Sequence, residues 1–102
     1  MSDEKSNSVN QRQMSFVLGQ VYATPGALAA LQKSGQSYIG FLARHLRGDW
    51  GEVCKEDWSA NDQAVKEGTR LLSAYRTSKD ERIWIITETD RSTTTLLLPD
   101  EY

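Results

Sequence analysis

Residues 68–102 read GTRLLSAYRTSKDERIWIITETDRSTTTLLLPDEY, and the pattern of this stretch decides the fold. Three runs rich in β-branched and apolar residues, at about 69–76, 82–88 and 93–98, are separated by two short polar turns. Loops of that length join neighbouring antiparallel strands. The stretch therefore predicts a three-stranded antiparallel meander, against which the preceding part of the chain packs.

The preceding residues carry three helix patterns with start and stop signals. Thr24 followed by Pro25 is typical of a helix start, because the threonine hydroxyl accepts a free N–H and the proline lacks one. Gly35 ends that helix, Ser37 begins the next, and Gly68 ends the third. We expect an α+β fold with helices at about 25–34, 37–47 and 55–67 packed on one face of the sheet.

The N-terminal segment divides into a tail and a short apolar stretch. Residues 1–14 are polar and charged without periodicity, so we expect a disordered tail followed by a single domain over residues 15–102. Residues 16–22 are apolar and rich in β-forming residues. This composition favours a fourth strand at an edge of the sheet over a single helical turn.

The run at 82–88 is apolar on both sides of a strand. Ile83 and Ile85 alternate with Trp84 and Ile86, which predicts a central strand covered on both faces for part of its length. We expect Trp84 and Ile86 to face the helices, and Ile83 and Ile85 to share the opposite face with Leu97. If the N-terminal segment leaves that second face uncovered, it would be the surface of a homodimer. The expected core comprises Leu28, Leu31, Phe41, Leu42, Leu46, Leu72, Ala74, Trp84, Ile86, Leu96 and Leu98.

Composition describes a soluble globular protein. Charged residues make up 25% of the 102 residues and hydrophobic residues 38%. The net charge of −2 and the pI of about 5.3 argue against broad nucleic-acid binding, which depends on Lys and Arg at the phosphates. No apolar run is long enough to span a membrane, no secretory signal is visible, and a single Cys54 fits a reducing compartment. We expect a cytoplasmic protein without a cofactor.

His45 and Cys54 carry the most reactive side chains. His45 lies one turn before Asp49 near a helix end, so it is either a hydrogen-bonded structural histidine, which is the commoner role, or a general base. No signature of a cysteine hydrolase flanks Cys54, and a buried thiol is commoner than a nucleophile. The spacing of His45, Asp49, Glu52 and Cys54 matches none of the familiar zinc patterns, so we expect no metal site.

Two loops and one strand face gather further polar and aromatic groups. The second turn of the meander holds Glu88, Asp90 and Arg91, which either stabilise the hairpin or form a polar site facing the loop at 48–51. We expect Trp50 of that loop to fold back onto the core. The candidate binding residues are Asp49, Trp50, Asp90 and Arg91. Bases could also stack on a face carrying Arg70, Arg76, Arg82, Tyr75 and Trp84, although long side chains lying across a half-exposed sheet are commoner.

Several motifs together resemble a group of small bacterial proteins carried on plasmids, genomic islands and similar mobile elements. They are ATPGAL at 23–28, RH at 44–45, GDWG at 48–51, ND at 61–62, LSAY at 72–75, WIITE at 84–88, DRS at 90–92 and LPDEY at 98–102. The resemblance covers about residues 20–102. It implies a bacterial, cytoplasmic protein of the mobile gene pool, integron cassettes included, and it implies no particular activity. Cys54 departs from the pattern, in which an acidic or polar residue is more usual.

The leading functional hypothesis is a non-enzymatic accessory protein that binds an unknown host or element-encoded protein through the sheet face or the loop at 48–51. The alternative is a ribonuclease toxin of the barnase and RelE class, which the order of helices and meander resembles. His45, Glu88 and Arg91 would then be the catalytic residues, sharing the roles of general base, general acid and cation. A weaker alternative is a small-ligand pocket between the second hairpin and the Trp50 loop.

Overall fold

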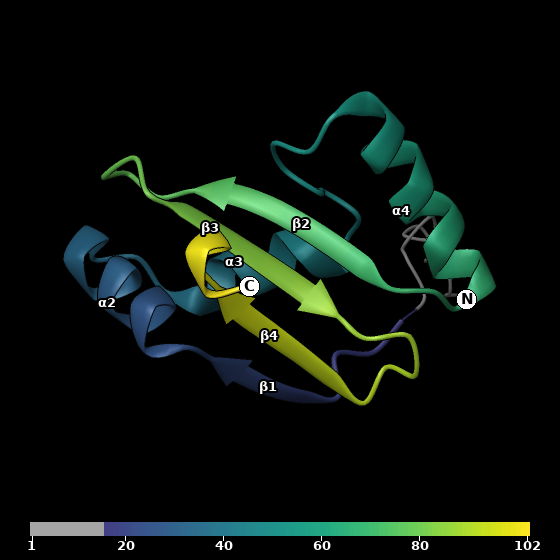
Figure 1. Cartoon of the computed structure of the whole chain (residues 1–102), viewed down its shortest axis with the longest axis horizontal. Coiled ribbons are helices and arrows are strands. Elements are labelled where there is room, and N and C mark those ends of the chain that lie inside the picture. Colours follow the sequence, from purple (N-terminus) through teal and green to yellow (C-terminus); the bar gives the residue numbers. More distant parts are fainter. Residues whose placement is uncertain (1–15) are drawn as a thin grey trace, which may run out of the picture.

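A four-stranded sheet forms the centre of the computed structural model, which describes residues 16–102 (Figure 1). Strands β2 (Leu71–Arg76), β3 (Arg82–Thr87) and β4 (Thr93–Leu97) form the predicted antiparallel meander. Strand β1 (Gln20–Ala23) lies at the edge beside β4, so the order across the sheet is β1-β4-β3-β2. The tail predicted at residues 1–14 lies outside the described residues.

The expected fourth strand makes the sheet mixed rather than purely antiparallel. β1 runs parallel to β4, with Val21 opposite Thr94. Parallel neighbours cannot be joined by a tight turn, because the chain must return to the end of the sheet at which the first strand began. The helices and the first two strands of the meander together make that return.

The helices begin and end close to the predicted positions. They are α2 (Pro25–Ser34), α3 (Tyr38–Leu46) and α4 (Lys55–Glu67), followed after the sheet by the short 3-10 helix η2 (Pro99–Glu101). The Thr24 hydroxyl accepts the N–H of Ala27 at 3.1 Å, and the Ser37 hydroxyl accepts that of Ile39 at 3.1 Å. No helix within residues 16–102 has the length and apolar character that a membrane crossing requires.

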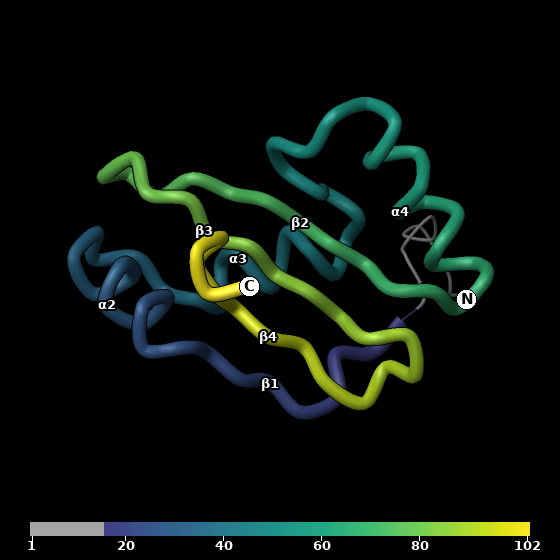
Figure 2. Tube along the Cα trace, viewed as in Figure 1, coloured from purple at the N-terminus to yellow at the C-terminus, as the bar shows by residue number. Residues whose placement is uncertain are grey.

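The helices are not arranged as a single layer. α3 crosses behind the strands, whereas α4 lies beyond β2 at the edge of the sheet, and η2 lies in front of it (Figures 1 and 2). β1 forms the opposite edge (Figure 2). The two edges of the sheet therefore have different neighbours.

The face that packs against the helices is the one opposite to our prediction. Ile83, Ile85 and Leu96 are fully buried in one cluster with Phe41 and Leu42 of α3. Strand alternation consequently turns Trp84, Ile86, Leu72 and Ala74 to the outer face, and Leu97 lies with them. Ile86 and Leu97 are buried there too, at 3% and 6% exposure, so β3 is covered on both faces for part of its length, as predicted. Leu28, also predicted in the core, is 51% exposed. The choice of the face toward the helices was wrong because β3 is apolar on both faces, so its pattern does not identify the one that the helices cover.

Candidate functional site

His45 is fully buried where α3 crosses beneath the sheet, and its ring joins two strands. Nδ1 lies 2.6 Å from the hydroxyl of Ser73 on β2, and Nε2 lies 2.9 Å from the hydroxyl of Thr87 on β3. The Thr87 hydroxyl is 2.8 Å from that of Thr94 on β4, which donates to the carbonyl of Leu18 at 2.8 Å. We call this series, from Leu18 to Ser73, the buried polar chain.

The donor and acceptor of each hydrogen bond in the buried polar chain can be assigned by starting from the Leu18 carbonyl. The Leu18 carbonyl can only accept, so the Thr94 hydroxyl donates to it and must accept from Thr87. Thr87 in turn accepts the proton on Nε2 of His45, which leaves Nδ1 to accept from the Ser73 hydroxyl. His45 is therefore a neutral imidazole protonated at Nε2, with both ring nitrogens satisfied.

The surroundings of His45 keep it neutral. Burial, and to a smaller extent the positive charge of Arg91, lower its pKa to about 4. Phe16 and Trp50 each pack edge to face with the imidazole, and the centroid of each ring lies 5.5 Å from that of His45. A histidine enclosed in this way stabilises the fold through its two hydrogen bonds. It offers no surface at which a substrate could meet it.

Arg91 fastens the second hairpin to the end of α4. Its backbone is left-handed, with φ of 60°. Its guanidinium donates to the carbonyl of Thr69 at 2.7 Å, that of Glu88 at 3.0 Å and that of Ala64 at 3.1 Å. The Ala64 carbonyl lies in the last turn of α4, where the helix dipole makes a cation favourable. Arg91 thus acts as a clamp within the fold.

The acidic residues of the second hairpin, Glu88 and Asp90, contact groups other than His45. The Glu88 carboxylate lies 3.7 Å from Nε of Arg70, and the Asp90 carboxylate accepts the N–H of Ser92 at 2.9 Å. The hydrogen bond from Ser92 holds the pKa of Asp90 below its usual value. The four residues His45, Asp49, Glu88 and Arg91 therefore serve separate local contacts, and the convergence that we hypothesised is absent from residues 16–102.

The loop at 48–51 is anchored to the core by Trp50. Trp50 is fully buried, as predicted, and its indole N–H donates to Asp62 at 2.9 Å. Asp49 pairs with Arg44 at 2.8 Å, and this hydrogen bond holds the pKa of Asp49 below its usual value. The Asp49 carbonyl accepts the Tyr75 hydroxyl at 2.6 Å. Tyr75 is consequently buried on the helix side and takes no part in the outer face with Arg70, Arg76 and Arg82.

Cys54 lies at the surface, immediately before α4. Our prediction that it is buried was therefore wrong. Within residues 16–102 no three His, Cys, Asp or Glu side chains are grouped so that they could hold a metal ion.

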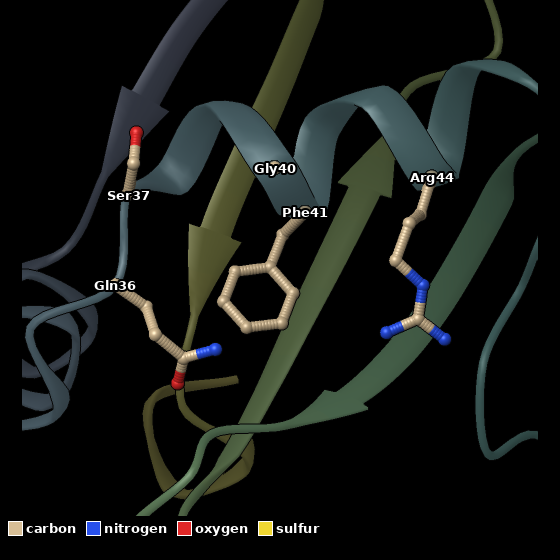
Figure 3. Close-up of a pocket in the computed structure, with 5 residues that line it drawn as sticks. All are labelled: Gln36, Ser37, Gly40, Phe41 and Arg44. Carbon is tan, nitrogen blue, oxygen red and sulfur yellow. The ribbon is translucent and has the colours of Figure 1, made fainter.

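A shallow groove of about 340 Å³ runs along α3 and is lined by Gln36, Ser37, Gly40, Phe41 and Arg44 (Figure 3). Its polar side chains already have partners inside the protein. Gln36 accepts the N–H of Ser78 at 2.8 Å, Ser37 caps α3, and Arg44 pairs with Asp49 and stacks on Tyr75. The groove therefore presents little that would fix the orientation of a polar ligand.

The edge of the sheet at β2 is closed by two neighbouring segments. The side-chain amide of Asn61 donates to the Leu72 carbonyl at 2.8 Å and accepts the Leu72 N–H at 3.2 Å, as a neighbouring strand would. The N–H of Ala74 donates to the Trp50 carbonyl at 3.0 Å, and its carbonyl accepts the Glu52 N–H at 2.6 Å.

Gly51 makes the contact between the loop and β2 possible. A Cβ at this position would overlap the Ala74 carbonyl and lie 2.7 Å from the Tyr75 ring, and φ is 78°. Both conditions favour glycine.

Within residues 16–102, β1 has no neighbouring strand on the side away from β4. The N–H groups of Gln20 and Thr24 donate to the carbonyls of Ser92 and Leu96, so these residues point toward β4. By alternation, the main-chain groups of Val21 and Ala23 point away from it. Three large apolar side chains at or near this edge are exposed, namely Val17 at 64%, Val21 at 39% and Tyr22 at 53%. Among residues 16–102, no segment covers this edge as Asn61 and the loop cover β2.

Sequence reasoning missed the pairing of Asn61 with Leu72 and the three hydroxyl residues of the buried polar chain. Ser73 and Thr87 each interrupt an alternating apolar pattern, and a polar residue on a buried strand face requires a partner. These two interruptions were therefore the available sequence signal that Ser73 and Thr87 have a buried polar partner, which the structure shows to be His45. Asn61 lies one helical turn before buried Ala64, which places its amide on the packed side of α4.

No protein-family model matches this chain, no curated protein is similar to it, and no solved structure matches it, so the assignment of function depends on geometry and chemistry alone.

Proposed function

We propose that this protein is a non-enzymatic protein-binding module that accepts an extended segment of another chain along β1. The observation that carries the proposal is the difference between the two edges of the sheet. The main-chain groups of β2 are paired by Asn61 and the loop at 48–51, whereas those of Val21 and Ala23 face outward.

An unpaired strand edge is a template for another strand. Main-chain hydrogen bonds supply affinity when a peptide adds to a sheet, and side chains on alternate sides supply specificity. At β1 the exposed Val21 lies on the helix side of the sheet and the exposed Tyr22 on the outer side. An added strand would therefore find an apolar contact on each face of the sheet.

The ribonuclease hypothesis has less support from the same geometry. A general base must come within hydrogen-bond reach of the proton that it removes. His45 is fully buried and has a pKa of about 4, and Arg91 is bound to three backbone carbonyls. His45 and Arg91 therefore could not reach a phosphate without rearrangement of α3 or of the hairpin, whereas Glu88 is exposed at the surface.

Nucleic-acid binding is likewise less well supported. On the outer face, Arg70 pairs with Glu88 and donates to the Tyr102 hydroxyl, and Arg76 pairs with Glu52 and Asp80. These ion pairs neutralise Arg70 and Arg76, two of the three arginines that phosphates would need on this face. A bacterial mobile-element origin remains a prediction from the sequence motifs.

The test is a comparison of binding by edge variants. Val21→Pro removes one outward N–H while leaving the bonds between β1 and β4 in place, since proline is tolerated where the N–H of an edge strand faces solvent. The matched control is Ile39→Lys, which changes a 62% exposed apolar residue on α3. We expect wild type and Ile39→Lys to bind the same protein chain, either a second copy or another protein captured from a bacterial lysate, and Val21→Pro to lose it. Equal binding by all three proteins would overturn the proposal.

A further inference from the structure

The hydrogen-bonding groups exposed at β1 form a symmetrical set. Val21 and Ala23 each present one N–H and one carbonyl away from β4, and Tyr22 lies between them with its own groups turned toward β4. The free groups are therefore spaced equally on both sides of Tyr22. Such a set is complementary to itself when a second copy is turned through 180° about Tyr22.

This two-fold arrangement defines an antiparallel register. Val21 of each copy lies opposite Ala23 of the other, and each such pair exchanges two hydrogen bonds. The two Tyr22 residues then face each other as the non-hydrogen-bonded pair, with Cα atoms about 4.5 Å apart. Their rings, 53% exposed in the single chain, would pack together on the outer face.

The absence of charged residues around β1 favours a second copy over an acidic or basic partner. Residues 13–32 contain no Asp, Glu, Lys or Arg, although a quarter of the whole chain is charged. Natural edges are commonly protected from self-pairing by charged side chains or proline within the strand. Because β1 has neither, two copies meet there without like-charge repulsion, whereas a charged peptide would find no ion partner in this segment.

We infer that the chain occupying the β1 edge is β1 of a second copy, so that two four-stranded sheets join into one continuous sheet. This inference rests on the proposed function and names its partner. The homodimer predicted from the sequence has its interface on an exposed face of the sheet. In the dimer inferred here the interface is the β1 edge, and Tyr22 of each copy extends the outer face of the other.

The first measurement is the mass of the full chain by sedimentation equilibrium. A contact this small predicts weak association, so concentrations should run from about 10 µM to about 1 mM. We expect the mass to rise from 11.5 kDa toward twice that value, with Ile39→Lys behaving as wild type. Val21→Pro should remain monomeric, and Val21→Lys provides a second blocking variant should the proline disturb the fold. A wild type that is monomeric throughout, or blocking variants that are as dimeric as wild type, would overturn the inference.

The second measurement tests the register by disulfide formation. In a Cys54→Ser background, which removes the single native cysteine, Tyr22→Cys should crosslink two chains on oxidation, since paired cysteines need Cα atoms about 4.4–6.8 Å apart. Gln20→Cys is the matched control. In this register Gln20 faces Thr24 of the other copy, which separates the two positions numbered 20 by about 13 Å. Crosslinking of both variants, or of neither, would contradict the pairing.

The outcomes separate this inference from the proposed function. A monomeric wild type from which Val21→Pro still removes a captured protein would overturn the second-copy inference and leave the binding module standing. A monomer whose captured proteins are unchanged by Val21→Pro would overturn both.

Discussion

The two edges of the sheet are treated in opposite ways by the rest of the chain. At β2, an asparagine amide from α4 and a loop centred on Gly51 pair the outward main-chain groups. At β1, the strand is short and uncharged, no segment of residues 16–102 pairs with its outer side, and Tyr22 is exposed on it. Closing an edge requires neighbouring structure, and this chain supplies it on one side alone among its described residues. The open edge is therefore the surface at which strand pairing would occur.

The buried polar chain links the two edges beneath the sheet. It begins at Leu18, just before β1, passes through β4 and β3, and reaches Ser73 on β2 by way of His45. Every strand except β1 contributes a hydroxyl to it. A change at His45 should consequently be felt at both edges, whereas a change at Val21 should remain local.

The largest effect should follow from removing the indole that anchors the closed edge. Trp50→Ala empties a fully buried site and frees the loop that pairs with Ala74, so we expect a loss of about 3–5 kcal/mol in the free energy of unfolding. Urea denaturation followed by circular dichroism measures it. Trp58→Ala, at a half-buried indole on α4, is the matched control and should cost clearly less. Equal losses in the two variants would mean that Trp50 has no special role at the edge.

Acidification should produce the next largest effect, through His45. Its pKa is about 4 in the folded protein against 6.5 when unfolded, so the unfolded chain binds the proton first. Stability from this source is complete above pH 6.5, falls as the pH drops from 6.5 to 4, and changes no further below. The full loss is about 3 kcal/mol, taking 1.36 kcal/mol for each pKa unit.

The check on this pH dependence is the variant His45→Asn. His45 is the single histidine, so its removal should abolish the slope between pH 6.5 and about 4.5, although the variant starts less stable. Asp49, whose pKa is lowered by Arg44, titrates at lower pH and so affects a different window. A slope that survives in the variant would show that another group titrates there.

The sequence predicted those elements of the fold whose boundaries are determined by residues at the boundary itself. Thr24 and Pro25 begin α2 through their own chemistry, and Gly35 ends it at a φ of 72° that glycine adopts without strain. The direction of β1 has no such local cause. Four residues can pair either way, and the choice depends on where the helices return the chain.

The buried polar chain and the covered face of β3 also depend on distant residues. His45 meets Ser73 and Thr87 across 28 and 42 positions of sequence. No single stretch contains that information, and the apolar outer face of β3 concealed it further. The sequence accordingly grouped His45 with Glu88 and Arg91, whereas the hydrogen-bond partners of His45 in the structure are Ser73 and Thr87.

A smaller effect should follow from opening the closed edge at a single side chain. Asn61→Ala leaves the N–H and carbonyl of Leu72 without their partners, and we expect a loss of about 2 kcal/mol. The amide of Leu72 should also exchange with solvent faster, as hydrogen exchange by NMR measures. Gln63→Ala, at an exposed position of the same helix, should change stability by less than about 0.5 kcal/mol. Unchanged exchange at Leu72 in Asn61→Ala would show that the β2 edge is closed by something else.

The smallest effect on stability should come from the open edge itself. Val21→Lys places a charge on a side chain that is already 39% exposed and breaks no hydrogen bond between β1 and β4, so in dilute protein we expect a change below about 0.5 kcal/mol. Because a partner that binds only the folded chain raises its apparent stability, the difference should grow with concentration. The midpoint temperature of thermal unfolding should therefore rise with protein concentration for wild type and stay constant for Val21→Lys. Parallel rises in the two proteins would show that any association uses a surface other than β1. A large loss in dilute Val21→Lys would mean that this edge, like the one at β2, is already part of the folded core.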